Sequence, residues 1–432
     1  MKSNKKVVIL GAGLSGLSAA WHLQKNGQDC VVFEKEKEVG GLCRSKKVNG
    51  FIFDCDGHLL HFKNKQTLDL VKRLLNNNIA KHSRSAWVYT RNRLIHYPFH
   101  ANLRDLPQPI ARRCLLDFIS ASSEKKTNGG TNFLKWVNCS FGKSISRHFM
   151  IPYNKKFWTV SLKELTCEWM QDFLVKPTLN HVVQGYCTDE PNYLGYNANF
   201  YYPKKGGINQ LPLAFESQIR NIYKNSTISS INLKKKEIII KEQKYAENFD
   251  SLILTIPLPE LTKIINPLPE RILEMLNKLR WNSIFNLNLG IDGNIVDNKH
   301  WVYFPQRETS FFRLGFSHNF ARKNTPDGKS SVYAEVSYPC TTTIDKTKTV
   351  TKILRGLKSI GIIKGRADIS ALDVNIIKYG YPIYDHNYNQ ARKEIIKFLL
   401  RNNIFPCGRY GNWRYMSMEG AILDGRDVAR AI

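Results

Sequence analysis

A glycine-rich turn near the N-terminus constrains the fold of this chain most strongly. The apolar residues 7–10 are typical of a buried parallel strand, and Gly11-x-Gly13-x-x-Gly16 follows them directly. In such a turn the first glycine permits a tight bend, the second lets a pyrophosphate approach the backbone, and the third lets the next helix pack closely. The phosphates then face a helix N-terminus, which favours negative charge. The pattern predicts a dinucleotide-binding α/β unit.

A second apolar run, residues 30–33, ends at Glu34, where a carboxylate commonly holds a ribose hydroxyl. The cofactor-binding residues predicted from this unit are Gly11, Gly13, Leu14, Ser15, Gly16, Glu34 and Lys35. The following stretch, which contains Gly40-Gly41-Leu42, resembles a turn that lies against FAD in flavoproteins related to amine oxidases. This resemblance favours FAD over NAD and adds Gly41 and Leu42 to the cofactor site, with a plain surface turn as the alternative.

Length and composition limit which classes of protein this chain can belong to. A chain of 432 residues can bury a large core and is expected to form at least two domains. Nine cysteines without a Cys-x-x-Cys pair are typical of reduced thiols, so we predict a cytoplasmic location and no metal site. No apolar run is long enough to form an integral membrane segment.

The formal net charge of +28 favours anionic partners. The lysines form short, scattered clusters without the pattern of a nucleic-acid module, so we expect a phosphorylated small molecule and no nucleic acid. A lysine-rich composition without a specific partner is the alternative. Peripheral association with a membrane and the oligomeric state stay open.

The order of patterns predicts an α/β fold in which a Rossmann-like FAD-binding domain carries two further domains. Segments 1–80, 200–265 and 396–432 are assigned to the discontinuous FAD-binding domain. Segment 81–199 is predicted to be an inserted, mainly helical substrate domain, and segment 266–395 an antiparallel β-sheet substrate domain.

Several individual elements are expected within these segments. Apolar spacing predicts a helix over residues 162–174, and a continuous apolar run predicts a buried strand over 251–258. Alternating residues predict short strands at 286–291, 301–304 and 332–336.

Sequence blocks spread over nearly the whole chain resemble one family. They include Phe51-x-Phe53-Asp54-x-x-Gly57-His58, Tyr97-Pro98-Phe99, Pro152-Tyr153-Asn154-x-Lys156-x-Trp158, Trp301-x-Tyr303, Phe312-Arg313, Gly380-Tyr381-Pro382 and Gly408-Arg409-Tyr410-Gly411. The chain resembles the UDP-galactopyranose mutases, particularly their eukaryotic-type branch, within the flavoproteins related to amine oxidases and protoporphyrinogen oxidases.

The resemblance implies a redox-neutral conversion of a nucleotide sugar between pyranose and furanose forms, in surface-glycan or sugar-metabolite biosynthesis. In that family, N5 of reduced FAD attacks the anomeric carbon, and the resulting adduct recloses with the other ring size. NAD(P)H is one candidate reductant. The protein would then supply position and electrostatics, which fits the lack of an obvious Ser-His-Asp, Cys-His or paired-carboxylate constellation in the sequence.

The resemblance also implies residue roles. His58, with Gly57, would shape the surroundings of flavin N5, and Arg313 would clamp the diphosphate, because a guanidinium matches phosphate oxygens. The other expected substrate contacts are Tyr97, Arg147, Asn197, Trp301, Tyr303, Tyr381 and Tyr415. The other expected FAD contacts are Gly408, Arg409, Tyr415 and Met418.

The chain departs from the family at several of these blocks. Ile151 stands where a second diphosphate-binding arginine is expected, and Arg147, one helical turn earlier, is predicted to replace it in part. A hydrogen bond to a charged group contributes about 1.5–3 kcal/mol, so its loss would weaken binding roughly 10- to 100-fold. Asp56 replaces a glycine beside the flavin, His100 replaces a glutamine, and the turn after Tyr415 is shorter.

Functions from different classes therefore stay open. Arg313 and the tyrosines favour a mutase that acts with reduced FAD. Ile151 and the short turn favour an FAD-dependent oxidoreductase, either an oxidase or a dehydrogenase, on the same scaffold. A flavin-bearing binding protein without turnover is a third alternative.

Overall fold

The computed structural model describes residues 5–123, 132–170, 177–188, 194–195, 198–241 and 245–432. Its first sheet is five-stranded and parallel throughout. The strands, in order across this sheet, are β19 (Ile404–Pro406), β13 (Ser251–Leu254), β1 (Val7–Leu10), β2 (Cys30–Phe33) and β9 (Ile222–Tyr223). Three distant parts of the chain thus build the sheet that ends at the glycine-rich turn.

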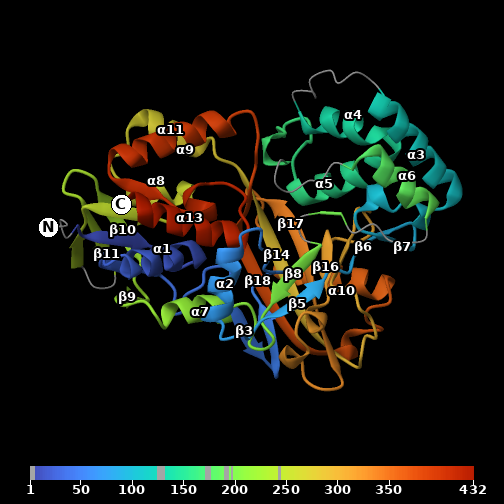
Figure 1. Cartoon of the computed structure of the whole chain (residues 1–432), viewed down its shortest axis with the longest axis horizontal. Coiled ribbons are helices and arrows are strands. Elements are labelled where there is room, and N and C mark those ends of the chain that lie inside the picture. Colours follow the sequence, from blue (N-terminus) through green and yellow to red (C-terminus); the bar gives the residue numbers. More distant parts are fainter. Residues whose placement is uncertain (1–4, 124–131, 171–176, 189–193, 196–197, 242–244) are drawn as a thin grey trace.

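Helices cover both faces of this parallel sheet. Val7 and Ile9 pack in one core with α1 (Leu14–Lys25) and α13 (Met418–Ala431), which lie side by side. Val8 and Leu10 pack in another core with α9 (Glu270–Asn277) and α11 (Tyr388–Arg401). Figure 1 shows α9 and α11 in a layer above α1 and α13. The doubly covered sheet confirms the predicted α/β class.

Smaller elements surround this sheet. The additional helices are α2 (Lys65–Leu74), α7 (Gln210–Glu216), α8 (Leu261–Ile264) and α12 (Gly408–Gly411). The strands β10 (Ile228–Asn232), β11 (Glu237–Ile240) and β12 (Tyr245–Asn248) form a three-stranded sheet. Two strand pairs are formed by β3 (Ser45–Val48) with β4 (Phe51–Asp54) and by β5 (Ala80–Ser83) with β8 (Asn199–Tyr202).

A seven-stranded, mainly antiparallel sheet forms the centre of the molecule. Its order is β18 (Ile369–Pro382), β14 (Trp281–Asp292), β17 (Lys329–Pro339), β16 (Arg313–Gly315), β15 (Trp301–Tyr303), β6 (Ala86–Thr90) and β7 (Arg93–His96). The last two strands lie within segment 81–199, so part of that segment joins the sheet. The predicted domain limits stay a prediction.

The two faces of this sheet differ in polarity. Phe285 and Leu287 on β14 point into a core that includes Ile353 of α10 (Lys346–Ser359). The alternate positions Asn286 and Asn288 are buried and polar, and they face the loop after β4. Because an apolar core covers one face of this sheet, the opposite face can carry a polar site.

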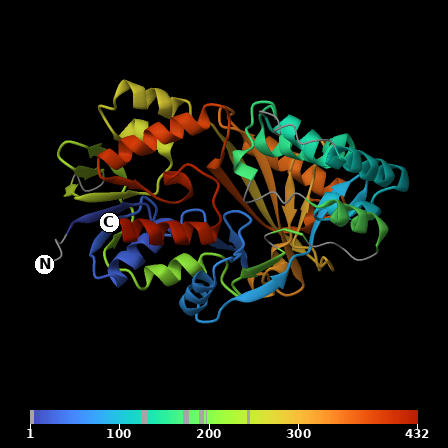
Figure 2. The same ribbon diagram turned by 45° about the horizontal axis from the view of Figure 1, so that its top comes forward.

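A helical cluster lies beyond this sheet, on the side opposite α1 and α13 (Figures 1 and 2). It contains α3 (Gln108–Ser123), α4 (Phe133–Ile145), α5 (Ile151–Trp158) and α6 (Leu179–Cys187). None of the helices in the described segments combines the length and the hydrophobicity that a membrane span requires.

Two predicted elements are wrong in extent. Residues 162–167 form turns instead of a helix, because the carbonyls of Leu162 and Leu165 accept hydrogen bonds from the first turn of α4. Residues 168–170 form a short 3-10 turn, and residues 171–174 of that predicted helix lie outside the part of the chain that the structure describes. The predicted strand over 251–258 ends at Leu254, before Pro257 opens a short 3-10 turn.

Candidate active site

The glycine-rich turn has the shape that a bound pyrophosphate requires. Gly11 has φ +98°, and a Cβ on Gly16 would lie 2.1 Å from the Gly11 carbonyl oxygen. A Cβ on Gly13 would meet no atom within 4 Å, so the space above Gly13 is open. Gly13 is also the N-cap of α1, whose first turn carries no acidic residue. The residues present therefore fit a dinucleotide phosphate at this helix terminus.

Glu34 is buried at the end of β2, beside this turn. Its Oε2 accepts the Ala12 N–H at 2.7 Å, and its Oε1 accepts the Glu36 N–H at 3.0 Å. These two bonds hold the carboxylate where a ribose diol of the cofactor would lie. Lys35 is exposed, and its ammonium lies 3.9 Å from the Glu36 carboxylate.

The second glycine-rich turn contacts the first. The Gly40 N–H donates to the Ala12 carbonyl at 2.8 Å, and Gly13 and Gly40 form a parallel β-bridge. A Cβ on Gly41 would lie 3.3 Å from Gly13 Cα. Leu42 packs against apolar residues of the large sheet and of α5. This turn therefore connects the nucleotide-binding unit to the polar face of the sheet.

The C-terminal segment also reaches the first turn. Gly408 has φ +78°, and a Cβ there would lie 2.2 Å from Ser15 Oγ. Leu14 and Ser15 are themselves buried. Met418 begins α13, where Ser417 caps the helix by accepting the Gly420 N–H. These contacts bring Gly408 to α1, as the FAD assignment expects.

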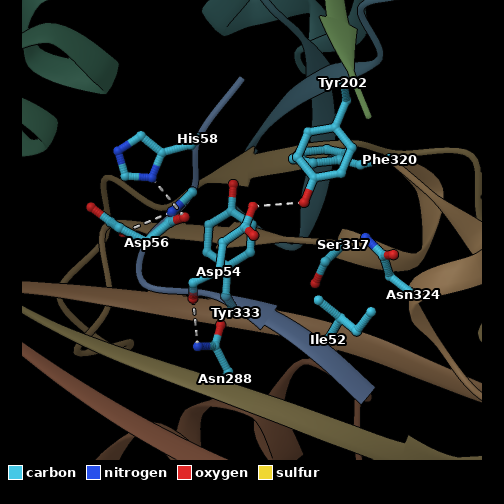
Figure 3. A pocket seen from close by; sticks show the side chains of 11 residues that line it. Ile52, Asp54, Asp56, His58, Tyr202, Asn288, Ser317, Phe320, Asn324 and Tyr333 are labelled. Carbon is cyan, nitrogen blue, oxygen red and sulfur yellow. Dashed lines mark hydrogen bonds between the residues drawn. The ribbon is translucent and has the colours of Figure 1, made fainter. Parts of the chain in front are cut away.

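His58 and Asp56 lie at one side of a small pocket between the loop after β4 and the large sheet. Figure 3 shows the Tyr202 hydroxyl directed at the Asp54 carboxylate in this pocket, at 2.6 Å. His58 Nδ1 lies 3.1 Å from the Asp56 carbonyl oxygen. Gly57 cannot carry a side chain, because a Cβ would lie 2.5 Å from the Tyr333 hydroxyl. The loop is thus packed closely onto the sheet.

Four of the predicted substrate contacts form two aromatic pairs. The rings of Tyr97 and Tyr303 are 5.0 Å apart, and those of Tyr381 and Tyr415 are 5.4 Å apart. Burial raises the pKa of Tyr97, Tyr303 and Tyr381 above the ordinary tyrosine value, so these phenols stay neutral and can donate hydrogen bonds. Trp301 is buried two positions before Tyr303 on β15 and contacts Phe320.

Arg313 lies on the polar face, bound to a residue that the sequence patterns did not single out. Its Nη2 donates to Glu335 Oε1 at 2.6 Å, and its Nε donates to Glu335 Oε2. Asp56 accepts the Asn286 side-chain N–H at 3.0 Å beside this pair. Only the register of strands β14, β16 and β17 brings these residues together, so local sequence signals could not find Glu335.

Arg409 stacks over the tyrosine pair Tyr381 and Tyr415, with its Cζ 4.4 Å and 5.1 Å from the two ring centroids. Its Nη2 donates to the Gly380 carbonyl, while its buried Nε has no hydrogen-bond partner among the described residues. A buried guanidinium with a free N–H can bind an anion. Since the preceding residue, Gly408, packs against Ser15, Arg409 connects the nucleotide-binding turn to this tyrosine pair.

Three further positions of the sequence analysis are Arg147, Ile151 and Asn197. Arg147 is exposed in a π-helical turn (Ser146–Met150), and its role stays a prediction. Ile151 is partly buried and packs against the apolar core of the helical cluster. Asn197 lies outside the residues that the structure describes.

Comparisons with known proteins agree with this arrangement. The family model of flavin-containing amine oxidoreductases matches residues 14–432. A crystal structure of reduced UDP-galactopyranose mutase is similar with a TM-score of 0.92 at 25% identity, over 98% of this chain and 94% of that chain.

Two curated relatives match over shorter stretches. UDP-galactopyranose mutase of Mycoplasma pneumoniae is 24% identical over 166 residues, which are 37% of this chain and 41% of that protein. Protoporphyrinogen oxidase 2 of Arabidopsis thaliana is 48% identical over 52 residues, which are 12% of this chain and 10% of that protein. The chain thus spans less than half the length of each of these relatives. The family model, by contrast, extends from the glycine-rich turn to the last residue, and this chain belongs to the flavin-containing amine oxidoreductase family.

Proposed function

We propose that this protein converts a nucleotide sugar between its pyranose and furanose forms with reduced FAD as cofactor. The observation that carries the proposal is the full-length similarity to reduced UDP-galactopyranose mutase, at a TM-score of 0.92. The polar sheet face adds support, because it brings Arg313 and the tyrosine pairs to the same side as the His58 loop.

In the proposed reaction, separate groups of residues bind the cofactor and the substrate. The glycine-rich turn and Glu34 would hold FAD, and reduced FAD supplies the nucleophile that the side chains lack. The neutral phenols of Tyr303 and Tyr381 would donate hydrogen bonds to the diphosphate oxygens. Arg313 would add positive charge beside the departing nucleoside diphosphate.

A second function is favoured by two observations at the same site. Ile151 leaves the diphosphate without the second arginine of the family, and Glu335 already binds the Arg313 guanidinium. Both reduce the number of guanidinium N–H donors that are available to a diphosphate. An FAD-dependent oxidoreductase, an oxidase or a dehydrogenase acting on a less charged substrate, is therefore the alternative.

The two functions differ in the flavin state that supports turnover. Dithionite-reduced protein is incubated with a panel of nucleotide sugars, and the products are separated by chromatography for ring-size isomers. We expect isomers only with reduced protein and without net oxidation. Turnover only by oxidised protein, with oxygen or a quinone consumed, would support the oxidoreductase.

Arg147 provides a test of how the missing arginine is replaced. Arg147→Ala is expected to weaken nucleotide-sugar binding roughly 10-fold, the lower end of the loss of a charged hydrogen bond. Unchanged affinity in a binding titration would remove Arg147 from the site.

A further inference from the structure

The polar face of the large sheet brings an arginine and a carboxyl group into register. Arg313 on β16 lies opposite Glu335 on β17, and Glu335 lies opposite Asn286 on β14. Glu335 and Asn286 are both 0% exposed. Because Arg313 donates to both oxygens of Glu335, a carboxyl group already occupies this side of the guanidinium before any anion binds.

A second carboxyl group reaches this row from the loop after β4. Asp56 Oδ1 accepts the Asn286 Nδ2–H at 3.0 Å and the Gly57 N–H at 2.9 Å, and Asn286 is the strand partner of Glu335, so both carboxyl groups flank Asn286 beside the Arg313 guanidinium. Two ionised carboxylates beside a single guanidinium would leave one negative charge uncompensated, and this repulsion favours keeping a proton on one of them. Asp56 and Glu335 are therefore favoured to hold one proton between them.

Burial places this proton on Glu335. Burial raises the pKa of Glu335 well above its ordinary value, and the Arg313 charge opposes the shift only in part. Burial also acts to raise the pKa of Asp56, but the hydrogen bond from Glu335 and the Arg313 charge together lower it below its ordinary value. The two carboxyl groups thus titrate as a coupled pair.

Other ionisable groups face the pair from every neighbouring element. They are Cys55 and His58 on the loop of Asp56, Tyr153 on α5, Tyr303 on β15, Tyr333 on β17, Tyr381 on β18 and Tyr410 on α12. Burial raises the pKa of the thiol and of all five phenols, so these groups stay neutral near pH 7. The thiol and the phenols therefore add no charge around Arg313 near pH 7.

We propose that binding of a diphosphate at Arg313 is linked to protonation of the Asp56–Glu335 pair. The proposal rests on the proposed function, because that function places the diphosphate at Arg313. With one proton on the pair, the charges of Asp56, Glu335 and Arg313 sum to zero. Without the proton they sum to minus one, and the site repels an anion. The diphosphate therefore favours the protonated pair, and by reciprocity the proton favours the diphosphate.

Isothermal titration calorimetry measures how many protons the protein takes up when the ligand binds. Oxidised, flavin-loaded protein is titrated with UDP-galactose in buffers of different ionisation enthalpy, between about pH 6 and pH 9. This probe is suitable because its phosphates are esterified and lack the second phosphate ionisation near pH 6. We expect uptake of about one proton per ligand towards the upper end of the range. Kd is expected to rise there by about tenfold per pH unit.

Three variants separate the linkage from a general effect of charge. Asp56→Asn and, independently, Glu335→Gln remove the shared proton and keep the side-chain shape. Both are expected to bind UDP-galactose with little dependence on pH, and about tenfold more tightly than wild type at the highest pH. Asp373→Asn is the matched control, because Asp373 lies one row away opposite Asn288 and pairs with Lys46. This control should keep the proton uptake of the wild type.

The outcomes distinguish this inference from the function on which it rests. Binding without proton uptake overturns the linkage, as does equal uptake in wild type, Asp56→Asn and Glu335→Gln. Absence of UDP-galactose binding throughout the pH range also overturns it. In each case the ring-isomer assay with reduced protein still decides the proposed function separately.

Discussion

At the residue scale, Gly13 and Gly16 belong to one turn but have different surroundings. A Cβ on Gly16 would clash with the Gly11 carbonyl oxygen at 2.1 Å, whereas a Cβ on Gly13 would meet no atom within 4 Å. The backbone of Gly13, with φ −69° and ψ 173°, is one that alanine adopts without strain. The fold therefore requires glycine at position 16, and only a ligand requires it at position 13.

This difference predicts that an alanine at position 13 affects FAD binding, whereas an alanine at position 16 affects the stability of the fold. Gly13→Ala should leave the free energy of unfolding of the flavin-free protein within about 0.5 kcal/mol of wild type. It should weaken FAD binding roughly 10- to 100-fold, because the methyl group moves the pyrophosphate away from the backbone amides. Gly16→Ala should destabilise the flavin-free protein itself.

Thermal unfolding without FAD and titration with FAD measure the two effects separately. A Gly13→Ala protein that binds FAD as tightly as wild type would show that no phosphate lies above Gly13.

At the element scale, Lys156 connects α5 to the loop between β15 and β16. Its Nζ donates to the Phe304 carbonyl at 2.9 Å, the Gln306 carbonyl at 2.7 Å, Thr309 Oγ1 at 3.1 Å and the Phe311 carbonyl at 2.8 Å. The strands that flank this loop carry Tyr303 and Arg313. The ammonium group thus positions two of the predicted diphosphate contacts at once.

Replacing this lysine should loosen the loop. Lys156→Met is expected to lower the free energy of unfolding by about 2–3 kcal/mol, because several carbonyl groups lose their donor. It should also weaken nucleotide-sugar binding. Lys155→Met is the control, since Lys155 is exposed on the same helix and should have little effect. Equal stability of the two variants in chemical denaturation would contradict the positioning role.

Lys156 also predicts a pH dependence of stability. Burial lowers its pKa from 10.5 to about 7 in the folded protein. Between these two pH values the unfolded chain binds more protons at this residue than the folded chain does, so its contribution to stability rises with pH. The stability difference between wild type and Lys156→Met should therefore increase from about pH 7 upwards, as measured by denaturant unfolding at several pH values. A stability difference that stays the same at all pH values would contradict the lowered pKa of Lys156.

Elements with strong local signals were predictable. The strand and helix on either side of the glycine-rich turn follow from its turn residues and from apolar patterning. Strand β18 was not predicted, because it lies at the sheet edge and its half-exposed positions carry polar residues such as Asp373. The prediction of a helix over 162–174 is wrong at residues 162–167, because the carbonyls of Leu162 and Leu165 accept hydrogen bonds from α4 instead of from their own segment.

At the scale of the whole molecule, the site is assembled from segments far apart in the chain. The glycine-rich turn and Glu34 are local and were predictable together. The arrangement of Asp56, Asn286, Glu335 and Arg313 depends on the register of three strands and on how the loop after β4 folds over them. Sequence alternation indicates which residues share a face, but it does not give the register between distant strands.

Because FAD would bind between these segments, removing it should destabilise the whole molecule. Ligand binding to the folded state alone adds about 4 kcal/mol when the free ligand is a thousandfold above Kd. Flavin-free protein is therefore expected to unfold at a lower temperature, and added FAD should raise the midpoint with increasing concentration. A midpoint that does not respond to FAD would contradict a cofactor role in joining the segments.

Every step proposed for the site requires FAD at the glycine-rich turn, and the flavin content of the purified protein tests this most directly. The protein is denatured, and the released flavin is identified by chromatography and quantified against the protein. We expect a yellow protein that releases about one FAD per chain. A colourless protein that releases no flavin and takes up no added FAD would contradict it.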